Sequence, residues 1–195
     1  MVDAIHLMRH GLVENPGQIR YGQLPGYRLS ARGREQARLA GEHLRSLARP
    51  IARIVASPLE RAVVTATIVQ EVLGLPAIST DARLIEPENA FDGLIRTAVL
   101  GPRHWPKLWN PFRPSWGEPF REVVARMHAV IHELRGEPGV LLVTHQAPIW
   151  IARQAFRSSG PPWLAPVRCT QASITSLRFD GDRYRGDWYW RPAVP

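Results

Sequence analysis

The chain has 195 residues, of which 45% are hydrophobic, a length and composition that suit one globular domain with a full-sized core. Because Cys169 is the only cysteine, the sequence excludes an intrachain disulfide and a cysteine-based metal site. The net charge of +8 comes from scattered arginines rather than from a basic block, so it favours attraction of small anions over binding of nucleic acid.

The first part of the chain begins with a strand, a loop and a helix. An apolar run at 3–8 predicts a buried strand, and the glycines and prolines of 11–30 predict a loop. Ser30 is expected to cap the N-terminus of a helix, which we expect Pro50 to end. A second buried strand is predicted over 51–56.

A helix and an irregular stretch follow. Apolar residues at helical spacing predict a helix over about 62–73 with Gly74 at its C-terminus, and a short edge strand is expected at 76–79. Residues 81–118 show no period and mix prolines with aromatic residues. Such a stretch is typical of a binding loop, so a lid-like insertion is predicted at about 87–118.

The last part of the chain returns to regular structure. We expect a helix over 119–135, a fully apolar strand at 140–144 and a helix over about 147–157. Two further strands, at 173–179 and 183–190, are expected to form a hairpin. The alternation predicts one α/β domain over the whole chain, a three-layer α/β/α sandwich around a mostly parallel sheet.

Polar residues stand at the ends of three predicted strands. The first strand ends in Arg9 and His10, Arg61 begins the helix after the second, and the apolar strand near residue 140 ends in His145. The carboxyl ends of parallel strands share one edge of a sheet, where open α/β sheets bind ligands. Arginines give bidentate hydrogen bonds to phosphate oxygens, and helix N-termini add backbone N–H groups. The sequence therefore predicts a pocket for a tetrahedral dianion.

Five motifs, in this order, resemble those of the histidine phosphatase superfamily, which contains phosphoglycerate mutases and many broad phosphatases. They are Arg9-His10-Gly11, residues 29–37, residues 57–66, Arg83-Leu84-Ile85-Glu86 and Val143-Thr144-His145. The resemblance covers most of the chain. It implies a phosphoglycerate mutase-like fold and a phosphoric monoester hydrolase of the histidine acid phosphatase type.

The resemblance also implies a role for each residue of the predicted site. His10 would be the nucleophile and form a phosphohistidine that water later hydrolyses. Arg9, Arg61 and His145 would hold the phosphoryl oxygens and offset charge in the transition state. Glu86 would protonate the leaving alkoxide and then activate water.

Further residues join these. Glu88 is the rival of Glu86 for the role of the acid. Asn15 resembles an asparagine that helps to bind phosphate in the family, and Arg20 resembles a loop arginine in segments of the R-x-x-G type. The backbone N–H of Gln146, at the predicted start of a helix, can donate to the substrate.

No metal, cofactor or membrane segment is expected. His128 and His132 are four residues apart on a predicted helix, but no third ligand is evident, so a solvated helix face is the better interpretation. Cys169 is expected to be a small buried hydrophobic residue. The chain enters a strand without a visible secretory signal, so cytoplasm is the expected location. The sequence leaves open whether the chain is a monomer or forms an oligomer such as a homodimer.

Three functions compete for this site. A phosphomonoesterase acting on a small phosphorylated metabolite is favoured, because the insertion is short and aromatic. A phosphoglycerate-type mutase must retain a bisphosphate, which favours extra basic residues and a longer insertion. A non-catalytic phospho-ligand module would need no acid. We expect Trp105, Trp109 and Trp116 to form the core of the lid rather than a platform on which a ligand stacks. The aromatic lid favours a substrate with an apolar or sugar portion next to its phosphate.

Overall fold

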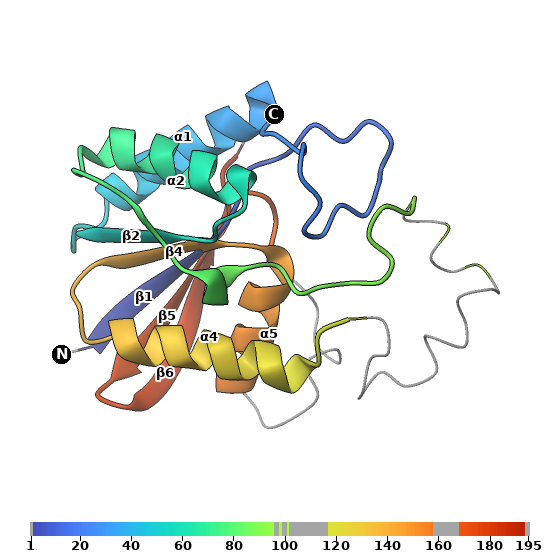
Figure 1. Ribbon diagram of the computed structural model, residues 1–195. Coiled ribbons are helices and arrows are strands. Elements are labelled where there is room, and N and C mark those ends of the chain that lie inside the picture. Colours follow the sequence, from blue (N-terminus) through green and yellow to red (C-terminus); the bar gives the residue numbers. More distant parts are fainter. Residues whose placement is uncertain (1, 96–97, 99–100, 102–116, 158–167, 194–195) are drawn as a thin grey trace.

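The computed structural model describes residues 2–95, 98, 101, 117–157 and 168–193, within which six strands form one sheet (Figure 1). The strands are β1 (Val2–Arg9), β2 (Arg53–Ala56), β3 (Ser79–Thr80), β4 (Val140–Thr144), β5 (Ile174–Asp180) and β6 (Arg183–Trp190). Their order in the sheet is β3-β2-β4-β1-β5-β6. The pairs β3–β2, β2–β4 and β4–β1 are parallel, whereas the pairs β1–β5 and β5–β6 are antiparallel. The predicted mostly parallel sheet is therefore confirmed.

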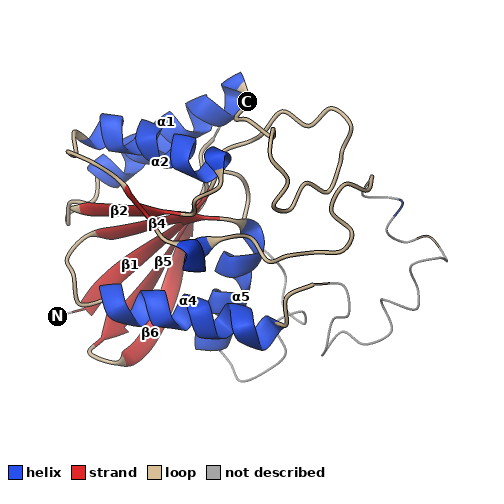
Figure 2. Ribbon diagram, in the orientation of Figure 1, coloured by secondary structure: helices blue, strands red, loops and turns tan. Residues whose placement is uncertain are grey.

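Helices cover both faces of this sheet (Figure 2). They are α1 (Ala31–Arg45), α2 (Glu60–Leu73), α4 (Phe120–Leu134) and α5 (Gln146–Arg157), with a short 3₁₀ turn, η1 (Ala82–Leu84). In Figure 1, α1 and α2 lie on one face, and α4 and α5 lie on the other. This arrangement is the three-layer α/β/α sandwich that the alternation of elements predicts.

The central strand β4 shows why a sheet of this kind needs a continuous apolar run. Val140 and Leu142 pack into the cluster formed with α4 and α5. Leu141 and Val143 pack into the cluster formed with α1 and α2. Because successive side chains of a strand point to opposite faces, both sets are buried, and no position on β4 is left for a polar residue before its end.

Two helix ends form as their sequence predicts. The side chain of Ser30 accepts a hydrogen bond from the Gly33 N–H and so caps α1. Gly74 adopts the left-handed conformation, with φ of 68°, and ends α2. A residue with a Cβ would be strained there, so the glycine stops the helix at little cost.

Two helix or strand boundaries differ from the prediction by three residues or more, and the others differ by two residues or fewer. Helix α1 ends at Arg45 rather than at Pro50, because the backbone N–H of Ser46 is shared among carbonyls of the last turn and its hydroxyl donates to one of them. Pro50 therefore does not end the helix, and that prediction is wrong. The edge strand predicted at 76–79 is two residues long and overlaps the prediction at Ser79.

The lid-like insertion predicted at about 87–118 lies largely outside the described residues, as do Trp105, Trp109 and Trp116. Its two ends are described, and they lie side by side. Asn89 and Gly117 form an isolated β-bridge, and the Glu118 N–H donates to the Glu88 carbonyl at 3.2 Å. Within the described ranges, none of the helices has the length and apolar character needed to span a membrane.

Candidate functional site

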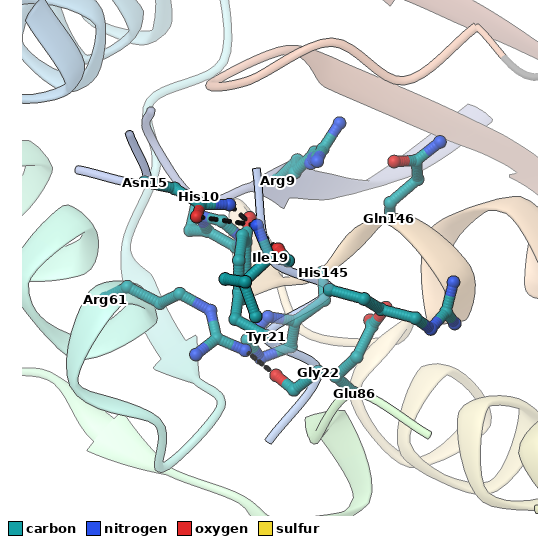
Figure 3. A pocket seen from close by; sticks show the side chains of 11 residues that line it. Arg9, His10, Asn15, Ile19, Tyr21, Gly22, Arg61, Glu86, His145 and Gln146 are labelled. Carbon is teal, nitrogen blue, oxygen red and sulfur yellow. Dashed lines mark hydrogen bonds between the residues drawn. The ribbon is translucent and has the colours of Figure 1, made fainter. Parts of the chain in front are cut away.

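A pocket of about 140 Å³ lies at the carboxyl edge of the parallel strands (Figure 3). It is lined by Arg9, His10, Asn15, Ile19, Arg20, Tyr21, Gly22, Arg61, Glu86, His145 and Gln146. All residues predicted for the site line this one pocket. Glu88, the rival acid, does not.

The sheet brings the two histidines together. Arg9 and Thr144 are paired residues of the adjacent parallel strands β1 and β4, so His10 and His145 each follow a strand end at the same level. Their ring centroids are 5.2 Å apart. The glycine after His10 is a packing requirement, because a Cβ on Gly11 would lie 2.4 Å from a carbonyl oxygen in the first turn of α1.

His10 is held in one tautomer. Its Nδ1 lies 2.8 Å from the carbonyl oxygen of Gly11, and a carbonyl oxygen can only accept, so Nδ1 carries the proton. The lone pair of the neutral ring is therefore on Nε2. Burial, and then the charges of Arg9 and Arg61, hold the pKa of His10 well below its usual range, so the ring is neutral at pH 7.

Two of the three arginines that line the pocket, Arg9 and Arg61, have unused donors. The guanidinium of Arg61 lies 4.9 Å from the ring centroid of Tyr21 and donates to the carbonyl of Gly22. Arg9 donates through Nη1 to the carbonyl of Cys169 at 2.7 Å. The buried Nε of each arginine has no hydrogen-bond partner within the described part of the chain. Buried donors without acceptors are costly, and an anion in the pocket would supply the acceptors.

His145 is oriented by a residue that the sequence analysis gave no role. Its Nε2 lies 2.7 Å from the hydroxyl oxygen of Ser57, at the end of β2. Burial and then the neighbouring His10 lower the pKa of His145 well below its usual range. Ser57 stands in the motif at 57–66, so its position after a strand was the available signal. Tyr21, which packs on Arg61, had no such signal.

Glu86 is a half-buried residue whose carboxyl oxygen Oε2 is buried beside the cations. The side chain of Gln23 donates to its backbone carbonyl at 2.6 Å, and the Ala147 N–H donates to its carboxylate. Burial raises the pKa of Glu86 to about 7, although Arg9 and Arg61 act to lower it. Its Oε2 has no hydrogen-bond partner among the residues that the structure describes. Glu86 can therefore hold a proton or lose it near neutral pH.

The remaining predicted residues, Asn15, Arg20 and Gln146, also line the pocket. The side chain of Asn15 donates to the Ile19 carbonyl at 2.8 Å and accepts from the Ile19 N–H at 2.9 Å, so it shapes the loop. The Nε of Arg20 lies 3.5 Å from the Oδ1 of Asp92, and 45% of the Arg20 side chain is exposed. Gln146 is the first residue of α5, so its backbone N–H is one of the free donors of a helix start.

The described residues hold no group of three or more histidine, cysteine, aspartate or glutamate side chains able to bind a metal ion. The predicted solvated helix face holds for His132, which is exposed, but is wrong for His128, which is half-buried because it stacks on Phe156 with ring centroids 4.2 Å apart. Cys169 is 5% exposed, which confirms the prediction that it is buried.

Comparisons with known proteins agree with this geometry. The chain matches the model of the histidine phosphatase superfamily (branch 1) over residues 5–190, so it belongs to this superfamily. Members of the superfamily and relatives named as phosphatases define the class of protein, a phosphatase or mutase. The family predicted from the five motifs is confirmed.

Individual relatives cover nearly the whole chain. It is 41% identical over 201 residues to "uncharacterized protein Rv0525" of Mycobacterium tuberculosis, covering 97% of this chain and 96% of the relative. It is 28% identical over 188 residues to the "uncharacterized phosphatase PhoE" of Bacillus subtilis, covering 93% and 91%. The solved mycobacterial glucosyl-3-phosphoglycerate phosphatase Rv2419c in complex with VO₃ superposes with a TM-score of 0.79 at 27% identity, covering 98% and 100%.

Proposed function

We propose that this chain is a phosphomonoesterase, which transfers the phosphoryl group of a small phosphorylated metabolite to His10 and then to water. The observation that carries the proposal is the hydrogen bond from His10 Nδ1 to the Gly11 carbonyl, which leaves the lone pair on Nε2. The same pocket contains a carboxyl group, Glu86, with a pKa of about 7. A relative that binds VO₃, an oxyanion, supports an anion site in this fold.

In the first step, Arg9, Arg61, His145 and the Gln146 N–H bind the phosphoryl oxygens. Nε2 of His10 attacks phosphorus, so that an N–P bond forms while the bond from phosphorus to the ester oxygen breaks. The departing electron pair goes to that oxygen, which takes the proton of the Glu86 carboxyl group and leaves as an alcohol. The Gly11 carbonyl stabilises the positive charge that develops on the imidazole ring.

In the second step, the Glu86 carboxylate removes a proton from water. The water oxygen attacks phosphorus, the N–P bond breaks and its electron pair returns to Nε2 of His10. Inorganic phosphate leaves, and Glu86 is protonated again, as at the start. Arg9 and Arg61 stabilise the carboxylate between the two steps, because opposite charges favour the ionised form.

The test is a covalent intermediate on His10. We expect the chain to release nitrophenol and inorganic phosphate in equal amounts from p-nitrophenyl phosphate, and base-quenched enzyme to carry phosphate on His10 by peptide mass spectrometry. The variant His10→Ala should lose at least about 10³-fold in kcat/KM, because the covalent route is closed. His132→Ala, the same change on an exposed site of α4, should keep wild-type activity.

Two outcomes would overturn the proposal. Rapid isomerisation of 3-phosphoglycerate in the presence of 2,3-bisphosphoglycerate, with little free phosphate, would identify a mutase. Binding of inorganic phosphate by folded protein that releases none from any ester would identify a binding module.

A further inference from the structure

A second hollow adjoins the phosphate pocket. It also has a volume of about 140 Å³, and Arg20 and Glu86 line both. Its lining consists of Arg20, Glu86, Pro87, Glu88, Asn89, Glu118, Phe120, Val123, Ala147, Trp150 and Ile151. Apart from Glu86, the proposed mechanism uses none of these residues directly on the reacting atoms, and the Ala147 N–H acts only by donating to the Glu86 carboxylate.

The chemistry of the first step places the leaving group toward this hollow. In an in-line displacement, the leaving oxygen lies on the side of phosphorus opposite to the nucleophile. The acid must reach that oxygen to protonate it, so the ester oxygen lies next to Glu86. The rest of the leaving alcohol then continues beyond Glu86, where the second hollow begins.

The walls of the hollow are apolar and aromatic. Phe120, at the start of α4, packs edge-to-face against Trp150 of α5, with ring centroids 6.5 Å apart and planes at 89°. Val123 and Ile151, both buried, continue the wall on the same two helices. Such a surface binds a hydrocarbon chain or ring through loss of water-exposed apolar area.

The polar part of the lining is mainly acidic. Glu88 and Glu118 line it, and Glu118 is held by two hydrogen bonds from Arg126, at 2.8 and 2.9 Å. Arg20 is the basic residue among the described lining residues, and it lies 3.5 Å from Asp92. Among the described lining residues, an alcohol with its own carboxylate or phosphate would meet Glu88 and would find Arg20, which already pairs with Asp92, as the only cation, and this disfavours such an alcohol.

We propose that this hollow binds the alcohol part of the substrate and selects neutral alcohols with an apolar ring or chain over alcohols that carry a carboxylate or a second phosphate. The inference rests on the proposed phosphomonoesterase activity and adds the class of substrate. Glu88 and Phe120 are the specificity-determining residues, the first through charge and the second through apolar contact.

The experiment compares three primary alkyl phosphates: benzyl phosphate, glycerol 3-phosphate and 3-phosphoglycerate. The last two differ in a carboxylate that replaces a neutral hydroxymethyl group. We expect kcat/KM to be highest for benzyl phosphate, and about tenfold lower for 3-phosphoglycerate than for glycerol 3-phosphate. Glu88→Lys should remove this tenfold difference, because it replaces a repulsive charge with an attractive one. Glu122→Lys makes the same charge change on α4 outside the hollow and should leave the ratio unchanged.

A second variant tests the apolar wall. Phe120→Ala should raise KM for benzyl phosphate about fivefold. Inhibition by inorganic phosphate should not change, because phosphate occupies the first pocket alone. Circular dichroism shows whether the variant folds. If Phe120→Ala does not fold, the effect of Glu88→Lys on the ratio of kcat/KM for glycerol 3-phosphate and 3-phosphoglycerate tests the proposal by itself.

The two proposals fail in different ways. If folded wild-type protein hydrolyses none of the three esters or p-nitrophenyl phosphate, the proposed function is wrong. A different result would be hydrolysis of these esters through His10 while Glu88→Lys leaves the ratio of kcat/KM for glycerol 3-phosphate and 3-phosphoglycerate unchanged and Phe120→Ala leaves the KM for benzyl phosphate unchanged. In that case the proposed phosphomonoesterase activity is supported, and the proposed role of the hollow in specificity is wrong.

Discussion

Two buried carboxylates of this molecule lie beside arginines and behave in opposite ways. Asp187, on β6, accepts hydrogen bonds from Arg153 at 2.8 Å and from the Tyr184 hydroxyl at 2.6 Å, and Arg157 lies 3.2 Å away. Burial acts to raise the pKa of Asp187, but these partners hold it below its usual range. Glu86 has an oxygen without a partner in the described residues, and burial raises its pKa to about 7.

The difference shows that the depth of burial and the hydrogen bonds to the carboxylate oxygens, rather than nearby positive charge alone, decide whether such a carboxylate is ionised. Donors that reach both oxygens fix the charge of Asp187, so it ties α5 to β6 as a permanent anion. Arg9 and Arg61 stand near Glu86 without donating to it in any hydrogen bond that the described residues show. Glu86 can therefore exchange a proton, as an acid that serves a reaction must.

The largest expected effect tests this contrast through catalysis. Glu86→Gln keeps the shape of the side chain but has no proton to give, so kcat for an alkyl phosphate such as benzyl phosphate should fall about 10²- to 10⁴-fold. Nitrophenolate leaves without protonation, so p-nitrophenyl phosphate should still give a fast burst of product, followed by slow hydrolysis of the phosphohistidine. Rapid-quench kinetics measures both phases.

The matched control is Glu88→Gln, the same change two residues further along the chain. It should leave the kinetics with benzyl phosphate and p-nitrophenyl phosphate close to those of the wild type. If Glu88→Gln gives the large loss instead, the wrong carboxylate has been assigned as the acid.

A smaller effect is expected on stability when the paired carboxylate is removed. Asp187→Ala leaves Arg153, whose side chain is 11% exposed, without its partner. We expect the free energy of unfolding to fall by about 3 kcal/mol, measured by urea denaturation, while activity per folded molecule stays unchanged. Asp182→Ala removes a carboxylate that is 90% exposed and pairs with Arg135, so it should cost less than about 1 kcal/mol. Equal losses would show that burial does not distinguish the two pairs.

The sequence predicted the parts of the site that depend on strand ends. Arg9, His10, Arg61 and His145 meet in one pocket because the strands before them are parallel neighbours, and apolar runs reveal such strands. The roles of these residues remain predictions. Strand β4 could also be predicted from the sequence, because a strand that is buried on both faces has an unbroken run of apolar residues.

The sequence favours Glu86 over Glu88 only through the resemblance of the motif that Glu86 closes, and no periodic pattern in the chain decides between them. Both follow η1 in an irregular segment, where no period fixes the direction of a side chain. Distant groups place this segment: the Thr144 hydroxyl donates to the Leu84 carbonyl, and Gln23 donates to the Glu86 carbonyl. The contact of His145 with Ser57 is likewise a meeting of residues far apart in the chain.

The smallest expected effect is the pH dependence of stability. Glu86 has a pKa near 4.5 when unfolded and about 7 when folded, so between these values the native state holds a proton that the unfolded state has released. The free energy of unfolding therefore loses stabilisation as pH rises through this range. Glu86→Gln does not titrate, so from pH 5 to pH 8 it should gain about 2 kcal/mol relative to the wild type.

Urea denaturation of both proteins at pH 5 and pH 8 measures this gain, and the contributions of the lowered His10 and His145 pKa values cancel because both proteins share them. Asp187→Asn is the control, since the pKa of Asp187 is lowered and its stabilisation is lost only as pH falls below this range. A difference between Glu86→Gln and the wild type that does not change with pH would mean that Glu86 is ionised throughout. It would then resemble Asp187, and it could not supply the proton that the first chemical step needs.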